Sequence, residues 1–481
     1  MQRKSVKVNR VIYAGCAVGV LAASAGILFG AAPSKKAFIR LDKIDYLKTG
    51  GGLIQNARGE TVVLRGITLG SWLLQELRMC PNNGEDKARD YHATLAVLAE
   101  RFGDKKAVEL INIYLDNWIT VDDLDRLKKL GVNCVRVPFT YRNFQSDDNG
   151  TRIRNKDGGI DFSRLDWIVS ECGKRGIYVI LDMHGAPGFQ SSVPSCSREN
   201  ENTLFDCSLA GLKYRQRTAE LWQKLAGHFK GNPAVAAFDL LSGPADGFSG
   251  MDKNGCRLEH FYKKLLKVVR AEDPDRMLIV HGGNAVENLT GAKCFHGCNI
   301  VYQPDTEHLS LPEIDRLISD ISACPDRNIP LITDGFYADD IWDCALSAFN
   351  KNDIHWCVKA YKGVETRNSD LFVYTADMEP ADLQEDTFEQ IKSKWDKPCR
   401  TAVGFTRNKE FAAALKKYLT GADQTDRECP ADGESAVTVE VYNTAGDVPK
   451  ADSGKTDDPF KFVYGTVTLA GMGTLAELTK K

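Results

Sequence analysis

The sequence predicts an α/β fold, a (β/α)8 TIM barrel in which eight parallel strands alternate with helices around one core. From about residue 61 to residue 419, short β-branched or apolar runs alternate with amphipathic stretches, which is the pattern of a parallel sheet. The strand-like runs are eight in number, as a closed barrel of this type requires. A chain of 481 residues with 43% hydrophobic content can also bury the large core that such a barrel needs.

The predicted strands are short and rich in β-branched and apolar residues; they are Thr61–Ile67, Asn133–Pro138, Tyr178–His184, Val235–Leu241, Met277–His281, Asn299–Tyr302, Pro330–Asp334 and His355–Lys359. The predicted helices carry apolar residues at helical spacing; they are Val121–Leu130, Phe162–Arg175, Tyr214–Phe229, Leu258–Arg270, Leu311–Ser322 and Asp340–Asn350. In a barrel of this type the active site forms on the loops that follow the strands. Functional residues are therefore expected at the carboxyl ends of the predicted strands.

Two regions do not fit the barrel pattern. Residues Leu73–Trp118 look mainly helical and are expected to cover part of one end of the barrel. After Thr420 the composition shifts to Asp, Gly, Pro, Lys and Thr, and only Val437–Tyr442 and Phe460–Leu469 are apolar enough for strands. The barrel is therefore expected to span residues 45–420, with residues 421–481 as a loosely ordered tail or a small β appendage.

The charged residues are balanced, with 62 basic and 65 acidic side chains and a formal net charge of -3. Beyond the first residues, no run of Lys and Arg forms the basic footprint that nucleic acids select. We therefore expect no nucleic-acid partner, and we also expect no cofactor and no metal.

The N-terminal segment indicates export. Residues 1–10 carry positive charge and are expected to be cytoplasmic, whereas residues 11–32 are uncharged and long enough to cross a bilayer, which needs about 20 apolar residues. Residues 11–32 are either an uncleaved membrane anchor or a signal peptide that is cleaved near Gly30–Ala32. Cys16 lies in a lipoprotein-like context, but the apolar run continues past it. The rest of the chain is expected to be extracellular, either anchored or secreted.

Export makes the cysteines informative, because disulfides persist in oxidising compartments. The chain has 14 cysteines, and without Cys16 an odd number remains, so at least one thiol stays unpaired or bridges to another molecule. Two close pairs are candidate local bridges, Cys196–Cys207 and Cys294–Cys298. Zinc binding by the second pair with His296 is the alternative, although no second ligand pair follows at the required spacing.

Three stretches at predicted strand ends carry a family resemblance. They read Leu-Arg-Gly-Ile-Thr-Leu-Gly-Ser-Trp at 64–72, Val-Arg-Val-Pro at 135–138 and Tyr-Val-Ile-Leu-Asp-Met-His-Gly-Ala-Pro-Gly at 178–188. In this order they resemble signature segments of glycoside hydrolase family five, which includes cellulases and exo-β-1,3-glucanases. The resemblance covers roughly residues 45–420 and implies a barrel related to enzymes that act on β-linked glycans.

The resemblance also implies two catalytic glutamates, and neither is present. The family acid/base lies in Asn-Glu-Pro after strand four, where this chain has Ser242-Gly243-Pro244. The family nucleophile lies in Gly-Glu-Phe after strand seven, where this chain has Asp334-Gly335-Phe336. A retaining glycosidase needs both carboxyl groups about 5 Å apart, one to protonate the leaving oxygen and one to attack the anomeric carbon. The sequence therefore predicts a degenerate family member.

Nearby carboxylates are weak substitutes for these glutamates. Asp334 precedes the nucleophile position by one residue, so the alternation of side chains along a strand should point it away from the pocket. Asp246 lies in a Gly-rich loop, and Asp239 is expected to be a buried, hydrogen-bonded carboxylate. An aspartate also reaches less far than a glutamate, and a misplacement of about 1 Å can cost on the order of 100-fold in rate.

Other pocket positions of the family are changed as well. Asp305 and Glu307 stand where the family has a supporting His-x-Tyr, and Lys359 replaces a tryptophan platform for the sugar. Asp334, Asp305 and Lys359 therefore form a candidate salt-bridge network that fills the former sugar site.

Three positions match retained pocket residues of the family, namely Arg136, His184 and Trp72. Each also has a structural alternative: a buried ion pair for Arg136, a hydrogen-bonded core position for His184, and packing for Trp72. With the glutamates absent, the resemblance does not decide between these roles.

Taken together, the residues favour a catalytically inactive surface protein that binds a β-glucan, another polysaccharide or a protein through its remodelled cleft. The first alternative is an active β-glycosidase that uses relocated carboxylates such as Asp334. The second is a structural protein of the cell envelope, in which the odd cysteine forms an intermolecular bridge.

Overall fold

The computed structural model describes residues 44–77, 79–83, 87–244, 257–282, 299–304, 306, 309–323, 329–334, 342–364, 370–375 and 378–420. Residues 11–32 and 421–481 lie outside these ranges, so the predicted N-terminal segment and C-terminal tail are not described. Within the described ranges, no helix combines the length and the hydropathy of a membrane span.

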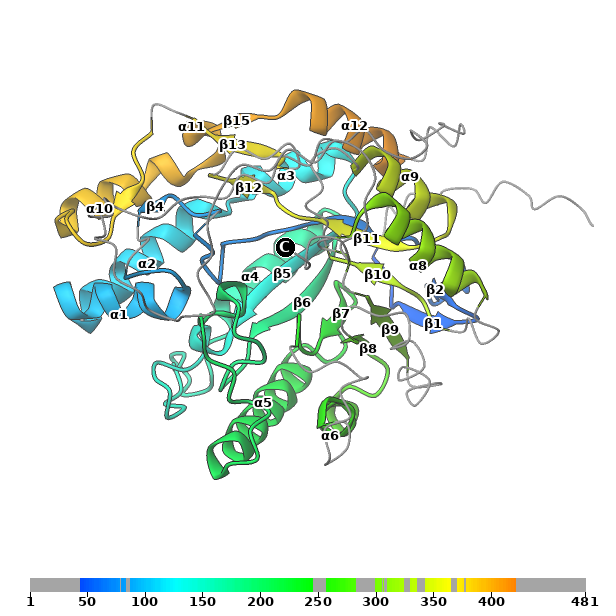
Figure 1. The fold of residues 1–481 in the computed structure, drawn as a ribbon, viewed down its shortest axis with the longest axis horizontal. Coiled ribbons are helices and arrows are strands. Elements are labelled where there is room, and N and C mark those ends of the chain that lie inside the picture. Colours follow the sequence, from blue (N-terminus) through cyan, green and yellow to red (C-terminus); the bar gives the residue numbers. More distant parts are fainter. Residues whose placement is uncertain are drawn as a thin grey trace, which may run out of the picture. The chain divides into compact units, whose positions relative to one another are not determined.

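Eight parallel strands form a barrel, and all eight predicted strands are present (Figure 1). Around the sheet they are β10 (Ile332–Thr333), β11 (His355–Val358), β3 (Arg65–Thr68), β5 (Cys134–Thr140), β6 (Tyr178–Gly185), β7 (Val235–Asp239), β8 (Met277–His281) and β9 (Ile300–Gln303). A parallel bridge between Tyr302 and Leu331 connects β9 back towards β10. The Tyr302 amide donates to the Pro330 carbonyl over 2.9 Å, which closes the barrel.

Helices follow the strands and cover the outside of the barrel (Figure 1). They are α3 (Val121–Leu130), α4 (Ser163–Lys174), α5 (Leu209–His228), α6 (Arg257–Glu272), α8 (Leu311–Ala323), α9 (Trp342–Lys351) and α12 (Lys409–Thr420). The sequence signals of α3 illustrate why they form. Thr120 and Asp123 make a capping box at its start, and Gly131 ends it in the left-handed conformation with φ 106°. Its apolar face, with Leu124, Leu127 and Leu130, is buried.

One end of the barrel is filled by apolar side chains. Cys134, Ile180, Met277 and Val301 belong to a buried cluster in its interior. A hairpin of β1 (Lys48–Gly50) and β2 (Leu53–Gln55) precedes the barrel and adds Ile54 to the same cluster. This end is therefore packed mainly with apolar groups, whereas the polar network around Arg136 lies at the carboxyl ends of the strands.

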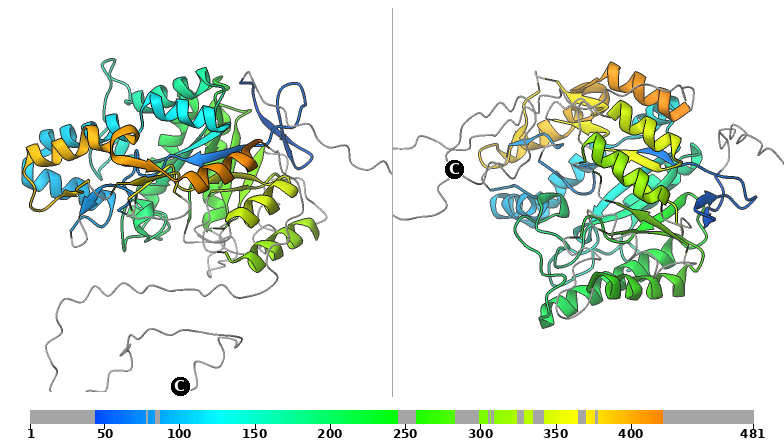
Figure 2. Two further views of the ribbon diagram at one scale, coloured as in Figure 1. Left: turned by 90° about the horizontal axis from the view of Figure 1, so that it is seen from above. Right: turned by 45° about the vertical axis from the view of Figure 1, so that its right-hand side comes forward.

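The insertion that interrupts the barrel is helical, as predicted, with α1 (Tyr91–Phe102) and α2 (Asp104–Trp118) preceded by the short β4 (Asn82–Asn83). It packs beside the barrel against α10 (Phe388–Trp395), and both views of Figure 2 keep these three helices together. Edge-to-face aromatic contacts join these helices. The ring centroids are 5.9 Å apart for Phe102 and Phe388 and 5.4 Å apart for Tyr114 and Trp395.

The segment between β11 and α12 forms small elements that the sequence pattern did not resolve. They are β12 (Lys362–Gly363), β13 (Phe372–Tyr374), β14 (Ala381–Asp382), α11 (Thr401–Gly404) and β15 (Phe405–Arg407). β14 pairs with β4 of the insertion, so these two additions form one layer at the side of the barrel.

The predicted disulfide between Cys196 and Cys207 is not formed, because Cys207 is exposed and unbridged whereas Cys196 is buried. The Cys196 thiol faces inward, where its Sγ lies 3.4 Å from Gln190 Nε2. The second predicted pair, Cys294–Cys298, and the zinc alternative with His296 lie outside the described residues.

Gly66 tests the close packing of β3 between its neighbours. A Cβ atom at this position would lie 2.1 Å from the Cys134 carbonyl oxygen and 3.0 Å from Cys357 Sγ. We expect Gly66→Ala to lower the free energy of unfolding by about 3 kcal/mol, since a backbone atom must move. Urea denaturation followed by circular dichroism measures this loss. Gly159→Ala is the control, because its Cβ would make only ordinary contacts with Asn155. Equal midpoints for the two variants would contradict the packing.

His355 predicts a pH dependence of stability. Its Nδ1 accepts the Leu64 amide over 3.1 Å, and burial lowers the pKa of His355 to about 4. As the pH falls below about 6.5, the unfolded chain takes up a proton that native His355 does not, so stability is lost between pH 6.5 and 4. The contribution is about 3 kcal/mol.

His355→Asn keeps an acceptor near the position of Nδ1 and removes the titration. Urea midpoints measured between pH 4 and 7 should therefore fall less steeply for this variant than for the unaltered chain. The exposed His260→Asn should leave the slope unchanged. Parallel slopes for all three proteins would show that His355 titrates normally.

Candidate functional site

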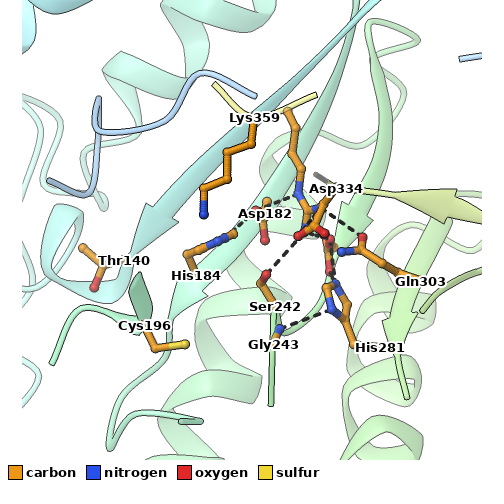
Figure 3. Close-up of polar contacts among 12 residues, drawn as sticks. Thr140, Asp182, His184, Cys196, Ser242, Gly243, His281, Gln303, Asp334 and Lys359 are labelled. Carbon is orange, nitrogen blue, oxygen red and sulfur yellow. Dashed lines mark hydrogen bonds and ion pairs between the residues drawn. The ribbon is translucent and has the colours of Figure 1, made fainter. Parts of the chain in front are cut away.

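A buried arginine lies at the centre of the barrel mouth, the end of the barrel where the strands terminate. Arg136 Nε lies 2.8 Å from Asp182 Oδ2 of β6, and its Nη2 lies 2.5 Å from Asp239 Oδ2 of β7. Its Nη1 lies 2.9 Å from Asp334 Oδ2, directly after β10. Three carboxylates from three parts of the barrel therefore share one guanidinium (Figure 3).

Strand register explains why these partners meet. Asp182 and Asp239 are direct neighbours across β6 and β7, and His281 and Gln303 are direct neighbours across β8 and β9. Gln303 Oε1 accepts from Arg136 Nη1 over 3.0 Å. The polar ends of adjacent strands thus lie at the same height around the barrel.

The three neighbouring carboxylates stabilise the positive charge of Arg136. Burial by itself lowers the pKa of the guanidinium, but the three carboxylates outweigh burial and raise the pKa above its usual value. Taking such a cation out of water costs several kcal/mol unless its partners are well placed. The arrangement therefore holds a permanent positive charge at the barrel mouth.

Two histidines extend the network. His184 Nδ1 lies 2.5 Å from Asp182 Oδ2. Burial opposes the charge on both groups, yet Asp182 raises the pKa of His184, and Arg136 with His184 lowers the pKa of Asp182. His281 Nδ1 accepts the Gly243 amide over 3.2 Å, so its Nε2 carries the proton that points to Asp239 Oδ1 at 2.9 Å.

The acid/base position of the family, Gly243, offers no side chain. The residue has φ 52°, and no described atom lies within 4 Å of where its Cβ would be. The preceding Ser242 is buried, with its Oγ 3.4 Å from Arg136 Nη2. The nucleophile position, Gly335, lies outside the described residues, as does Asp246.

The prediction that Asp334 points away from the pocket is wrong. Its carboxylate bonds to Arg136, and 24% of its side chain is exposed, whereas Asp182 and Asp239 are 0% exposed. The alternation rule failed because β10 ends at Thr333, so Asp334 lies beyond the strand and is free to turn inward. Asp239 is buried and hydrogen-bonded as predicted. Of the three aspartates around Arg136, only Asp334 is therefore partly exposed.

Lys359 is buried, and among the described residues it forms an ion pair with Glu76, which the predicted network did not include. Its Nζ lies 3.5 Å from Glu76 Oε2, while Asp334 pairs with Arg136. Asp305 and Glu307 lie outside the described residues, so their predicted part in the network is not described. Lys359 and Glu76 nevertheless form an ion pair where the resemblance implies a tryptophan platform.

Glu76 is a site residue that the sequence reasoning missed. It follows β3 in a loop held by reciprocal hydrogen bonds between Ser71 Oγ and the Glu76 backbone, at 2.8 and 3.1 Å. Its Oε1 is buried without a hydrogen-bond partner among the described residues. The sequence signal that could have identified Glu76 is an acidic residue close to the apolar Leu73 and Leu74.

The expectation that Trp72 is a retained pocket residue is not met. The indole is buried, and its Nε1 donates to the Leu115 carbonyl over 2.9 Å. Its ring meets Trp167 edge-on with centroids 5.6 Å apart. It therefore packs α2 and α4 against the barrel, which is the structural alternative predicted for this position.

A family model described as cellulase (glycosyl hydrolase family 5) matches residues 103–320, from α2 to α8. The match covers the strands that carry Arg136, Asp182 and Asp239, and the barrel is the fold that the resemblance implied. Residues 103–320 are therefore similar to the cellulase domain of glycosyl hydrolase family 5. The sequence prediction of family and fold is thereby confirmed.

Curated relatives of this chain include a β-xylosidase of Phanerodontia chrysosporium, 32% identical over 51% of this chain and 48% of the relative. A glucan 1,3-β-glucosidase of Candida oleophila is 26% identical over 44% of this chain and 48% of the relative. The chain thus spans about half the length of these two relatives. Among solved structures, a rutinosidase from Aspergillus niger superposes with a TM-score of 0.51 at 14% identity, covering 70% of this chain and 97% of the other. That likeness concerns the fold alone.

Removal of Arg136 tests the buried network. Arg136→Met would leave Asp182 and Asp239 buried without their cation, so we expect the free energy of unfolding to fall by about 3–5 kcal/mol at neutral pH. Urea denaturation measures the loss. Arg164→Met is the matched control, because Arg164 pairs with the exposed Asp116 and its loss should cost at most about 1 kcal/mol. A smaller loss at Arg136 than at Arg164 would refute the account.

Proposed function

We propose that this family-5 barrel is an extracellular, catalytically inactive protein that binds a β-glucan or a related β-linked polysaccharide in its cleft. The observation that carries the proposal is Gly243, which puts a hydrogen atom and open space where the family has its acid/base carboxyl. Cleavage of an ordinary glycosidic bond needs a proton donor for the leaving oxygen. The described carboxyl groups do not supply one readily.

Each described acid near Arg136 is poorly suited to proton donation. Asp182 and Asp239 are fully buried and bound to the guanidinium, and Arg136 with His184 holds the pKa of Asp182 low. Asp334 faces the cleft but is also paired with the guanidinium. The proton-bound form is therefore disfavoured at Asp182, and Asp239 and Asp334 each have a carboxylate oxygen engaged by the guanidinium.

The remaining polar groups suit sugar binding. Asp334, with 24% of its side chain exposed, presents carboxylate oxygens at the barrel mouth, and sugar hydroxyl groups can donate to them. Relatives named glucan 1,3-β-glucosidase and β-xylosidase support β-linked sugars as the ligand class. The charged and apolar N-terminal segment supports a position outside the cell, with residues 11–32 as a membrane anchor or a cleaved signal.

Calorimetry with laminari- and cello-oligosaccharides tests the proposal. We expect saturable binding to at least one series, together with no release of reducing ends over a long incubation. Asp334→Ala should weaken binding by about 10-fold, because one charge-assisted hydrogen bond to a hydroxyl contributes about 1.5–3 kcal/mol. Asp116→Ala, an exposed acid on α2, is the control and should bind unchanged.

The two halves of the proposal fail separately. Absence of binding to every oligosaccharide would refute the glycan ligand and favour a protein partner for the cleft. Release of reducing ends that disappears in Asp334→Ala would refute catalytic inactivity and establish the relocated-carboxylate glycosidase instead.

A further inference from the structure

We propose that the acidic segment directly after α12, residues 421–434, binds a basic groove on the outer side of the barrel of the same chain. The groove is separate from the barrel mouth, since none of the residues that line it takes part in the network around Arg136. Binding of the acidic segment is therefore independent of the glycan binding proposed for the cleft.

The groove lies between α3, α12 and the small sheet that contains β13 and β15 (Figure 1). Its volume is about 440 Å³. Leu130, Leu371 and Phe372 form its floor, and each of these side chains is at most 5% exposed. An occupant would cover little further apolar surface on such a floor. Polar groups must therefore supply most of its binding energy.

Four exposed cationic side chains line the groove. Arg126 and Lys129 come from α3, Arg407 from β15 and Lys416 from α12. Within the part of the chain that the structure describes, none of the four forms an ion pair. Arg126 does contact the floor, with its guanidinium carbon 5.9 Å from the centroid of the Phe372 ring. The groove thus gathers positive charge that the described residues leave without a salt bridge.

Two acidic residues of α3 also line the groove and offset part of this charge. Asp125 is already engaged, because its Oδ1 lies 2.7 Å from Arg175 Nε. Asp122 lies in the first turn of α3, where the helix dipole favours a negative charge. The four cations therefore still outnumber the acids that could neutralise them. Such a surface selects an anionic occupant.

The chain carries an anionic segment beside the groove. Residues 421–434 contain one basic residue, Arg427, and five acidic residues, which are Asp423, Asp426, Glu428, Asp432 and Glu434. Lys416 precedes Thr420, the end of α12, by four positions, which is about 6 Å along a helix. An extended chain advances about 3.3 Å per residue. The acidic segment is therefore long enough to reach all four cations.

Covalent attachment favours this segment over an acidic region of another molecule. Exposed ion pairs are individually weak, so a free acidic peptide would occupy the groove poorly. A short tether instead gives an effective concentration on the order of 1 mM. A contact with a dissociation constant of about 0.1 mM would then be formed about ten times as often as it is broken.

Limited proteolysis of the full chain tests the contact. Glutamyl endopeptidase cuts after Glu428 and Glu434, and a bound segment is protected from it. At low salt we expect the chain to be cut at these sites about 10-fold more slowly than a synthetic peptide of residues 421–436. In about 0.5 M salt the protection should largely disappear, because screening then acts over only a few Å.

A charge-reversed groove is the decisive variant. Lys129→Glu combined with Lys416→Glu should remove most of the protection at low salt. Lys105→Glu combined with Lys156→Glu is the matched control, because both lysines are exposed, lie outside the groove and change the net charge equally. Equal cleavage rates for the unaltered chain and both double variants would overturn the proposal.

The acidic segment can be altered without touching any described residue. Asp423→Asn combined with Asp426→Asn keeps both cleavage sites and should raise the cleavage rate as the groove variant does. Asp447→Asn combined with Asp452→Asn, further along the chain, should not. If circular dichroism shows that the groove variant is misfolded, this pair still decides: undiminished protection in the first double variant overturns the contact.

Carbodiimide cross-linking identifies the occupant of the groove. Mass spectrometry of the digested full chain should show Lys129 of α3 joined to an acidic residue of 421–434. Isotope-labelled and unlabelled chains are mixed before the reaction. A cross-link within one chain supports the proposal. A cross-link between labelled and unlabelled chains would make a second copy the occupant and overturn it, as would the absence of any cross-link from Lys129.

Discussion

The barrel mouth depends on the burial of one cation, the guanidinium of Arg136. An arginine at this depth is tolerated only because carboxylates from β6, β7 and the end of β10 surround it. Each of those strands must therefore end at the height that brings its aspartate within hydrogen-bonding distance. Asp239 also bonds to His281 Nε2, and His281 Nδ1 accepts from the Gly243 amide. The position of Gly243 therefore depends indirectly on the arginine.

The nucleophile and acid/base positions of the family differ in what they contain in this chain. The carboxylate that contacts Arg136 from the cleft side is still present, although an aspartate one residue before the expected position supplies it. At Gly243, where the resemblance places the acid/base glutamate, a Cβ atom would meet open space.

Family membership and activity are thus separate questions for this chain. The fold follows from the packing of eight strands and their helices, and it remains complete although both family glutamates are replaced. Lys359 and Glu76 introduce a charged pair beside the same cleft. The described residues at the barrel mouth therefore include charged pairs that the family resemblance did not imply.

The sequence by itself determined the barrel, because strand and helix periodicities are local properties and their eightfold alternation admits few folds. It also determined the buried state of Asp239, since a strand residue among apolar neighbours must face the core. Only the tertiary structure decided the direction of Asp334, the pairing of Lys359 with Glu76, the packing of Trp72 and the separation of Cys196 from Cys207. Each of these depends on where a strand ends or on which loop lies opposite, and contacts between residues far apart in the chain leave no periodic trace in the sequence.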